Sequence, residues 1–124
     1  MQNTKDEDFK TLFNVEYLKE GDNINFPKQG ERVSVHYTGK FTNGKKFDSS
    51  IDRREPFLFN VGNGEVIQCW DKVVSRMSIG EKIKVLCPSQ LAYGSRGAGR
   101  AIPPNTDIGF EIELLGIKNR NPKI

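Results

Sequence analysis

The sequence predicts an α+β domain, in which several antiparallel strands share one hydrophobic core with a single short helix. Apolar and polar residues alternate along several short segments, which is typical of half-buried strands, whereas one segment alone has apolar residues at helical spacing. The chain also contains 12 Gly and 6 Pro among 124 residues, as a turn-rich, mostly β protein would. This length suits one domain with one core.

Strands are predicted in the first half of the chain over residues 15–18, 33–41, 45–49 and 57–61. The alternation is clearest in the second of these, where Val33, Val35 and Tyr37 share one face and His36 lies on the other. Asn43-Gly44 follows, and this dipeptide supplies the positive φ angles that tight hairpin turns need. The second and third segments are therefore expected to form a hairpin.

The second half contains the helix, two more strands and a long loop. Helical spacing of apolar residues predicts the helix over 66–77, and alternation predicts strands over 82–87 and 107–114. Residues 91–105 form a loop whose length indicates either function or mobility. Its glycines do not open a helix, because Pro103-Pro104 follow, so we interpret them as a hairpin tip rather than a phosphate-binding loop.

Composition argues against several classes of function. The formal charge is only +3, from 19 basic and 16 acidic residues, and no basic stripe typical of a nucleic-acid binder is visible. No segment has the length and apolar character of a signal peptide or a membrane span. Cys69, Cys87 and His36 are not spaced as zinc ligands, and we expect no disulfide framework. We therefore expect a cytoplasmic protein with no metal, cofactor, membrane or nucleic-acid partner.

The aromatic residues leave two interpretations open. His36 is the only histidine, so no catalytic triad can be argued, and we expect it to be an ordinary surface or hydrogen-bonded residue. Six aromatic residues come from separate segments: Tyr37, Phe47, Phe57, Trp70, Tyr93 and Phe110. Periodicity places them inside the domain, but it does not distinguish an ordinary core from the lining of a cavity.

Several motifs together resemble the FKBP family of peptidyl-prolyl isomerases. In chain order they are Val35-His36-Tyr37-Thr38-Gly39, Gly44–Ser50, Glu65–Trp70, Ala92-Tyr93-Gly94, Ile102–Asn105 and Phe110–Leu115. The resemblance covers roughly residues 13–117, which we take as the isomerase domain, with tails at 1–12 and 118–124. It implies an antiparallel sheet of about five strands wrapped around one short α-helix, with a hydrophobic pocket between them.

The resemblance also implies roles for ten residues. Trp70 would form the pocket floor, and the walls would be Tyr37, Phe47, Phe57, Val66, Ile67 and Phe110. Three residues would hold a ligand by hydrogen bonds: Ile67 through its backbone N–H, Tyr93 through its hydroxyl and Asp48 through its carboxylate. Ile102 would pack from the long loop. Asp48 could instead pair with Arg53, and Ile102 could simply anchor its loop. Six of these residues are expected to act in catalysis: Tyr37, Phe47, Asp48, Trp70, Tyr93 and Phe110.

The expected activity is cis–trans isomerisation of Xaa-Pro bonds, with an aliphatic residue before proline, in a monomer that also binds the macrolides tacrolimus and rapamycin. The alternative is a non-catalytic regulatory module that uses the same pocket and the loop 95–102.

Two residues or segments at the edge of the pocket differ from those of relatives. Cys69 stands where many relatives have a small residue such as glycine. The tip 96–101 carries two arginines, and this difference puts in question the contact that the tip of relatives makes with the phosphatase calcineurin in drug-bound complexes. We expect Cys69 to be a packed small residue rather than an exposed thiol.

Overall fold

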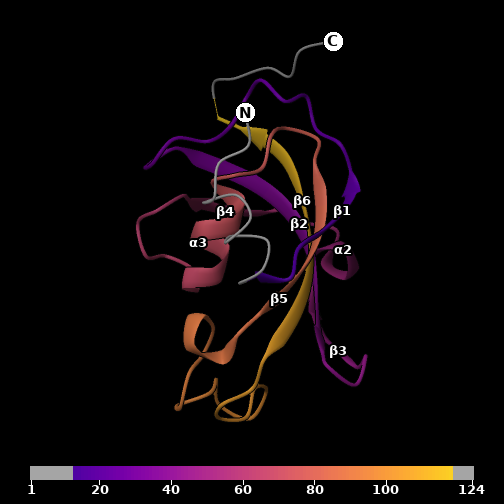
Figure 1. Cartoon of the computed structure of the whole chain (residues 1–124), viewed down its shortest axis with the longest axis vertical. Helices are drawn as coiled ribbons and strands as arrows, with labels where there is room; N and C mark the ends of the chain where they lie inside the picture. Colours follow the sequence, from indigo (N-terminus) through magenta and orange to yellow (C-terminus); the bar gives the residue numbers. More distant parts are fainter. Residues whose placement is uncertain (1–12, 119–124) are drawn as a thin grey trace.

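The computed structural model describes residues 13–118, so the predicted tail at 1–12 and all of the predicted tail at 118–124 except Lys118 lie outside the described residues. Its core is a six-stranded antiparallel sheet beside a short helix (Figure 1). The strands are β1 (Glu16–Lys19), β2 (Arg32–Phe41), β3 (Lys46–Ser49), β4 (Phe57–Asn60), β5 (Lys82–Cys87) and β6 (Ile108–Ile117). The α+β class is confirmed, with six strands where the resemblance implied about five.

Strands β2 and β6 form the middle of the sheet, whose order is β1-β5-β6-β2-β3. They pair along nearly their whole length, from Val33 opposite Ile117 to Phe41 opposite Ile108. Strand β4 pairs with the first half of β2 and β3 with its second half, on the same side of β2. The alternation read from the sequence holds, because Val33, Val35 and Tyr37 are all buried.

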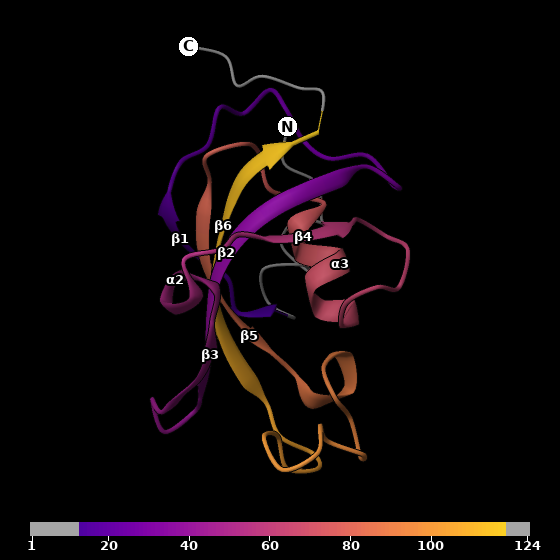
Figure 2. The ribbon, with the colours of Figure 1, turned by 180° about the vertical axis from the view of Figure 1, so that it is seen from behind.

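Helix α3 (Gln68–Val74) packs against one face of the sheet, as Figures 1 and 2 show from opposite sides. It is shorter than the predicted 66–77. Its first turn begins at Gln68 because Ile67 still has an extended backbone, with ψ at 149°. Its other end closes with tight turns in which Arg76 and Met77 donate their N–H groups three residues back. Apolar residues at helical spacing therefore extend beyond both ends of the regular helix, which is why the predicted range was too long.

Two short helical segments were not predicted. Helix α2 (Ser50–Arg53) follows β3 directly, and the 3-10 turn η1 (Ser89–Leu91) follows β5. The Ser49 side chain caps α2 by accepting the Asp52 N–H, and Arg54 ends it in a left-handed conformation. Segments of three or four residues are too short to show helical periodicity, so capping residues were the only signal available.

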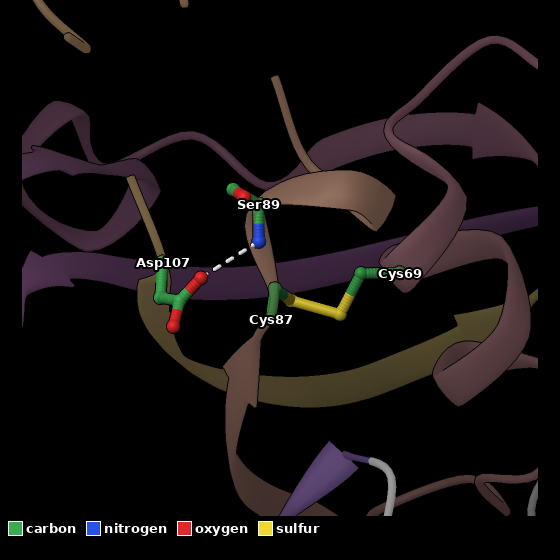
Figure 3. The surroundings of a disulfide bond; sticks show 4 residues. All are labelled: Cys69, Cys87, Ser89 and Asp107. Atoms are coloured by element: carbon green, nitrogen blue, oxygen red, sulfur yellow. Dashed lines mark hydrogen bonds between the residues drawn. A yellow bond between two sulfur atoms is a disulfide. The ribbon is translucent and has the colours of Figure 1, made fainter. Parts of the chain in front are cut away.

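Cys69 and Cys87 form a disulfide, so our expectation of no disulfide was wrong (Figure 3). Cys69 is the second residue of α3 and Cys87 is the last of β5, and their Cα atoms are 5.8 Å apart. The spacing of 18 residues matched no motif, because only the docking of α3 on the end of β5 brings the two together. Both side chains are fully buried, as expected for Cys87 and for a packed Cys69.

Among residues 13–118, no helix is long and apolar enough to cross a membrane. Within the same range, no three His, Cys, Asp or Glu side chains are grouped so that they could hold a metal ion.

Candidate functional site: an aromatic pocket beside α3

A cavity of about 450 Å³ lies between the start of α3, the sheet and the loop after η1. Its lining comes from β2, β3, β4, α3, β6 and two loops: Tyr37, Phe47, Asp48, Phe57, Gly64, Glu65, Val66, Ile67, Trp70, Tyr93 and Phe110. Nine of the ten residues that the resemblance placed in a pocket are in this list. Aromatic rings that are far apart in the sequence therefore line one cavity. Of the two interpretations left open by the sequence, this favours a lined cavity over an ordinary core.

A second cavity, of about 530 Å³, differs in chemistry. It lies over the outward-facing residues of β2, β5 and β6, and its lining includes Lys40, Lys84 and Glu111. Charged side chains of both signs line it together with two phenylalanine rings, whereas six aromatic residues line the first cavity. We therefore take the aromatic pocket as the candidate site, although the other cavity is larger.

Trp70 forms the floor of the aromatic pocket and is held by other rings. Its indole lies 4.8 Å from the Tyr37 ring and 5.2 Å from the Phe110 ring between centroids, both in edge-to-face contact. Trp70 is only 5% exposed. Its buried Nε1 has no hydrogen-bond partner among the described residues. The floor is thus an apolar surface whose orientation is fixed by packing rather than by polar contacts.

Gly39 makes room for two walls of the pocket. A Cβ at this position would lie 2.6 Å from Cζ of Phe47 and 2.9 Å from Cε1 of Phe110. These two rings contact each other edge to face, with centroids 5.9 Å apart. Any side chain at position 39 would have to displace one of them. The register shift between β2 and β3 also falls at this point, between Gly39 and Lys40, and leaves Phe47 without a paired partner in the ladder.

Two side chains bond to Asp48 at the edge of the pocket, in addition to the Ser49 backbone N–H. The Tyr37 hydroxyl donates to its Oδ2 over 2.6 Å, and Arg53 donates to its Oδ1. Arg53 also donates to the Tyr37 hydroxyl over 2.9 Å. Burial opposes ionisation, yet the hydrogen bonds from Tyr37 and Arg53 prevail and lower the pKa of Asp48. The alternative pairing with Arg53 is therefore present, and Asp48 lines the cavity as well.

Besides Trp70 Nε1 at the floor, two donors at the edge of the pocket lack a partner among the described residues. They are the Ile67 backbone N–H, at the residue before α3 begins, and the Tyr93 hydroxyl. Tyr93 is 37% exposed, and burial of its phenol, together with the charge on Asp48, raises its pKa. Both donors are available to a ligand carbonyl, which is the role that the resemblance implied for them.

Comparison with known proteins decides the family. A family model described as FKBP-type peptidyl-prolyl cis-trans isomerase matches residues 24–115. The chain belongs to this family. Similar proteins include peptidyl-prolyl cis-trans isomerase Fkbp12 of Drosophila melanogaster, 49% identical over 79% of this chain and 91% of that protein. Another is FK506-binding protein 1 of Kluyveromyces lactis, 50% identical over 81% of this chain and 88% of that protein. The chain is an FKBP-type peptidyl-prolyl cis–trans isomerase, as its motifs predicted.

Ile102 is the one site residue of this FKBP-type isomerase that the structure does not place at the pocket. It is 3% exposed and packs in the hydrophobic core, where its backbone pairs with Ala98. It therefore anchors its loop, which was the alternative role. His36 likewise has a local role, since its Nδ1 lies 2.9 Å from the Ser50 hydroxyl.

Glu65 and Gly64 line the pocket without having been predicted. The Glu65 carboxylate accepts the backbone N–H and the side-chain amide of Asn60, each over 3.0 Å, and so ties the end of β4 to the segment before α3. These hydrogen bonds lower the pKa of Glu65. No periodicity marks either residue, although Glu65 stands inside one of the family motifs.

The four titratable side chains that line the pocket each stay in one protonation state near neutral pH. The pKa values of Asp48 and Glu65 are lowered, and those of Tyr37 and Tyr93 are raised, mainly by burial. We therefore expect kcat/KM for a Leu-Pro peptide to be flat between about pH 5 and pH 9. Measurement of peptide exchange across this range checks the prediction, and a bell-shaped profile would contradict it.

Proposed function

We propose that the aromatic pocket is where this isomerase accelerates rotation about Xaa-Pro bonds, and that it does so without a covalent intermediate. The observation that carries the proposal is the apolar, ring-lined cavity with the Ile67 N–H and the Tyr93 hydroxyl unpartnered at its edge. Rotation about a peptide bond crosses a barrier of about 18–20 kcal/mol, because the twisted amide loses its resonance. The planar amide is the more dipolar of the two, so water stabilises the ground state more than the twisted state. An apolar pocket removes that advantage.

The residues of the pocket divide this work between them. The proline ring would lie on the indole of Trp70 between the Tyr37 and Phe110 rings, which fixes one side of the rotating bond. The Ile67 N–H and the Tyr93 hydroxyl would hold the substrate carbonyls on the other side. Interactions of this kind speed the reaction only where they favour the twisted amide over the planar one. No proton transfer is needed, in keeping with the flat pH profile expected above.

Tyr93→Phe tests one of these contacts. The change removes only the hydroxyl, so one hydrogen bond of about 0.5–1.5 kcal/mol is lost and kcat/KM should fall several-fold. Stability should hardly change, because the hydroxyl has no partner among the described residues. Peptide exchange and thermal unfolding of the variant measure the two effects. An unchanged kcat/KM would remove Tyr93 from the mechanism.

The same pocket is proposed to bind the macrolides tacrolimus and rapamycin. Similar proteins from yeasts and moulds are named FK506-binding protein, after the compound also called tacrolimus. The Asp48 carboxylate, partly exposed and at the pocket edge, would accept a ligand hydroxyl, while the rings hold an apolar ring of the drug. Displacement of a labelled macrolide by a Leu-Pro peptide tests whether the two share one site.

Three further properties are proposed from the sequence. The chain acts as a monomer, resides in the cytoplasm and contacts calcineurin in a drug-bound complex, with the tip 96–101 as the variable part of that contact. A cytoplasmic location bears on the disulfide, because glutathione and thioredoxin keep most thiols there reduced. Alkylation of free thiols in freshly lysed cells would report whether Cys69 and Cys87 are paired in place.

A regulatory binding module remains the second candidate function. Here the pocket and the loop 95–102 hold a partner protein, and isomerisation is incidental. The loop is well suited to this, since its backbone is ordered by hydrogen bonds between Ala98 and Ile102 and between Gly94 and Asn105. A pocket variant that loses peptide exchange but still replaces the wild-type protein in cells would favour the module. Loss of both would favour the enzyme.

A further inference from the structure

The loop after η1 and the β2–β3 hairpin lie at the same end of the sheet, the lower end in Figures 1 and 2. Residues 88–106 include two arginines and residues 40–46 include three lysines, and neither segment contains a carboxylate. Each segment also adjoins the aromatic pocket, because Tyr93 belongs to the first and Phe47 directly follows the second. The approach to the pocket is therefore cationic on this side, in a chain whose total formal charge is only +3.

Four of these five cations are free of ion pairs within residues 13–118: Lys40, Lys45, Arg96 and Arg100. Lys40 lines the other cavity, on the outer face of the sheet, so we call Lys45, Arg96 and Arg100 the cationic rim. All four cations are exposed. The fifth, Lys46, pairs with Asp52. Lys40 stands directly opposite Lys46 in the ladder, and like charges in that position lower the stability of a sheet. Internal packing does not account for this concentration of positive charge.

The two arginines of the rim are held in place by the backbone around them. Arg96 lies within a turn closed by the Gly97 N–H and the Tyr93 carbonyl, 3.1 Å apart. Arg100 lies within the small hairpin formed by Ala98 and Ile102, and Ile102 is buried. A Cβ at Gly97 would come within 2.3 Å of the Ile102 carbonyl oxygen, so the tip is tightly packed. The backbone that carries both arginines is thus ordered, in the same loop as Tyr93.

The carboxylates at the pocket do not neutralise the rim. Asp48 is paired with Arg53 and bonded to Tyr37, and Glu65 is bonded to Asn60. Asp107, at the base of the loop, accepts the Ser89 N–H over 2.8 Å (Figure 3). A peptide bound with its proline over Trp70 would therefore extend past two arginines that have no carboxylate partner of their own.

We propose that the cationic rim selects acidic polypeptide substrates, in which Asp or Glu stands within a few residues of the Xaa-Pro bond. This inference rests on the isomerase activity proposed above and names a substrate class for it. An apolar pocket beside a cationic rim fits a proline flanked by carboxylates. The proline of the substrate is desolvated in the pocket, while the carboxylates of the substrate stay in water and form ion pairs with the rim. Arg96 and Arg100 are the main specificity-determining residues, since they lie in the loop that carries Tyr93.

The test compares two peptides that differ only in charge. One carries Glu two residues before and two residues after the Leu-Pro bond, and the other carries Gln at both positions. At about 20 mM salt we expect kcat/KM to be roughly three- to ten-fold higher for the Glu peptide, as two exposed ion pairs would give. The ratio should approach one in about 0.5 M salt, because exposed charges are then screened.

Matched variants assign the effect to the tip. In R96Q/R100Q the ratio should fall to near one, whereas R96K/R100K keeps the charges and should retain most of it. K28Q/K118Q is the control, because both lysines are exposed and lie in the segments at the opposite end of the molecule (Figure 1). Each result is a ratio of two peptides on one protein, so a variant with a disturbed pocket still gives an answer.

Three outcomes would overturn the inference. A ratio of one for the wild-type protein shows that the rim does not select acidic substrates, and a ratio unchanged in R96Q/R100Q shows that the arginines are not responsible. Retardation of a short single-stranded oligonucleotide that depends on Arg96 and Arg100, without any peptide preference, would assign the rim to nucleic acid. Failure of the wild-type protein to accelerate either peptide would instead refute the proposed isomerase site itself.

Discussion

Replacing Trp70 by alanine is expected to lower kcat/KM for a Leu-Pro peptide by more than ten-fold. The indole is the floor of the pocket and the surface on which Tyr37, Phe57 and Phe110 pack, with centroids 4.8–5.8 Å away. Its removal opens the apolar site to water and frees the walls to move. The variant should also be less stable by about 3–5 kcal/mol, as for other buried tryptophans. Peptide exchange and urea unfolding measure the two effects.

Phe59→Leu provides the matched control. Phe59 also contacts the Trp70 ring, at 6.0 Å, and is buried, but it does not line the cavity. This substitution should lower stability with little effect on kcat/KM at a temperature where the variant is folded. A folded Trp70→Ala protein with full activity would contradict the assignment of the site. So would equal losses of activity in the two variants.

Loss of the Cys69–Cys87 disulfide is expected to lower the free energy of unfolding by about 3 kcal/mol. The bond closes a loop over a separation of 18 residues and so restricts the unfolded chain. Both sulfur atoms are fully buried between α3 and the end of β5, so the folded state changes little in its exposed surface. Thermal unfolding of C69A/C87A beside the wild-type protein measures the effect.

A reductant distinguishes the contribution of the disulfide to stability from that of the buried cysteine side chains. Wild-type protein unfolded in the presence of a thiol should lose most of this stability, whereas C69A/C87A should be insensitive to the thiol. If the thiol leaves the melting temperature of the wild-type protein unchanged, the bond contributes nothing measurable. The shift of C69A/C87A would then reflect only the loss of packed sulfur atoms.

The strands were predictable because their residues alternate, and the signal was strongest where one face is fully buried. Strand β2 shows this, since Val33, Val35 and Tyr37 point into the core. The limits of α3 were not predictable, because apolar residues such as Val66 and Met77 pack into the core from outside the helix as well as from within it. The disulfide depends on where α3 docks, which no local pattern contains.

The pocket residues came from the resemblance rather than from periodicity. Periodicity placed the aromatic rings inside the domain but did not show that they enclose a cavity. The structure adds Gly39, whose missing side chain accommodates Phe47 and Phe110. Glu65 was also missed, because its role depends on a hydrogen bond from Asn60 that only the folded structure reveals. Ile102 stands inside a family motif as well, yet its side chain is buried in the core and is not part of the cavity lining.

The most direct test of the proposed pocket is cis–trans exchange of a Leu-Pro peptide, measured by magnetisation transfer while tacrolimus is titrated in. We expect the protein to accelerate exchange and the acceleration to vanish at one equivalent of drug, because substrate and macrolide occupy the same ring-lined cavity. Exchange that stays fast when the protein is saturated with drug would place catalysis elsewhere and contradict the account.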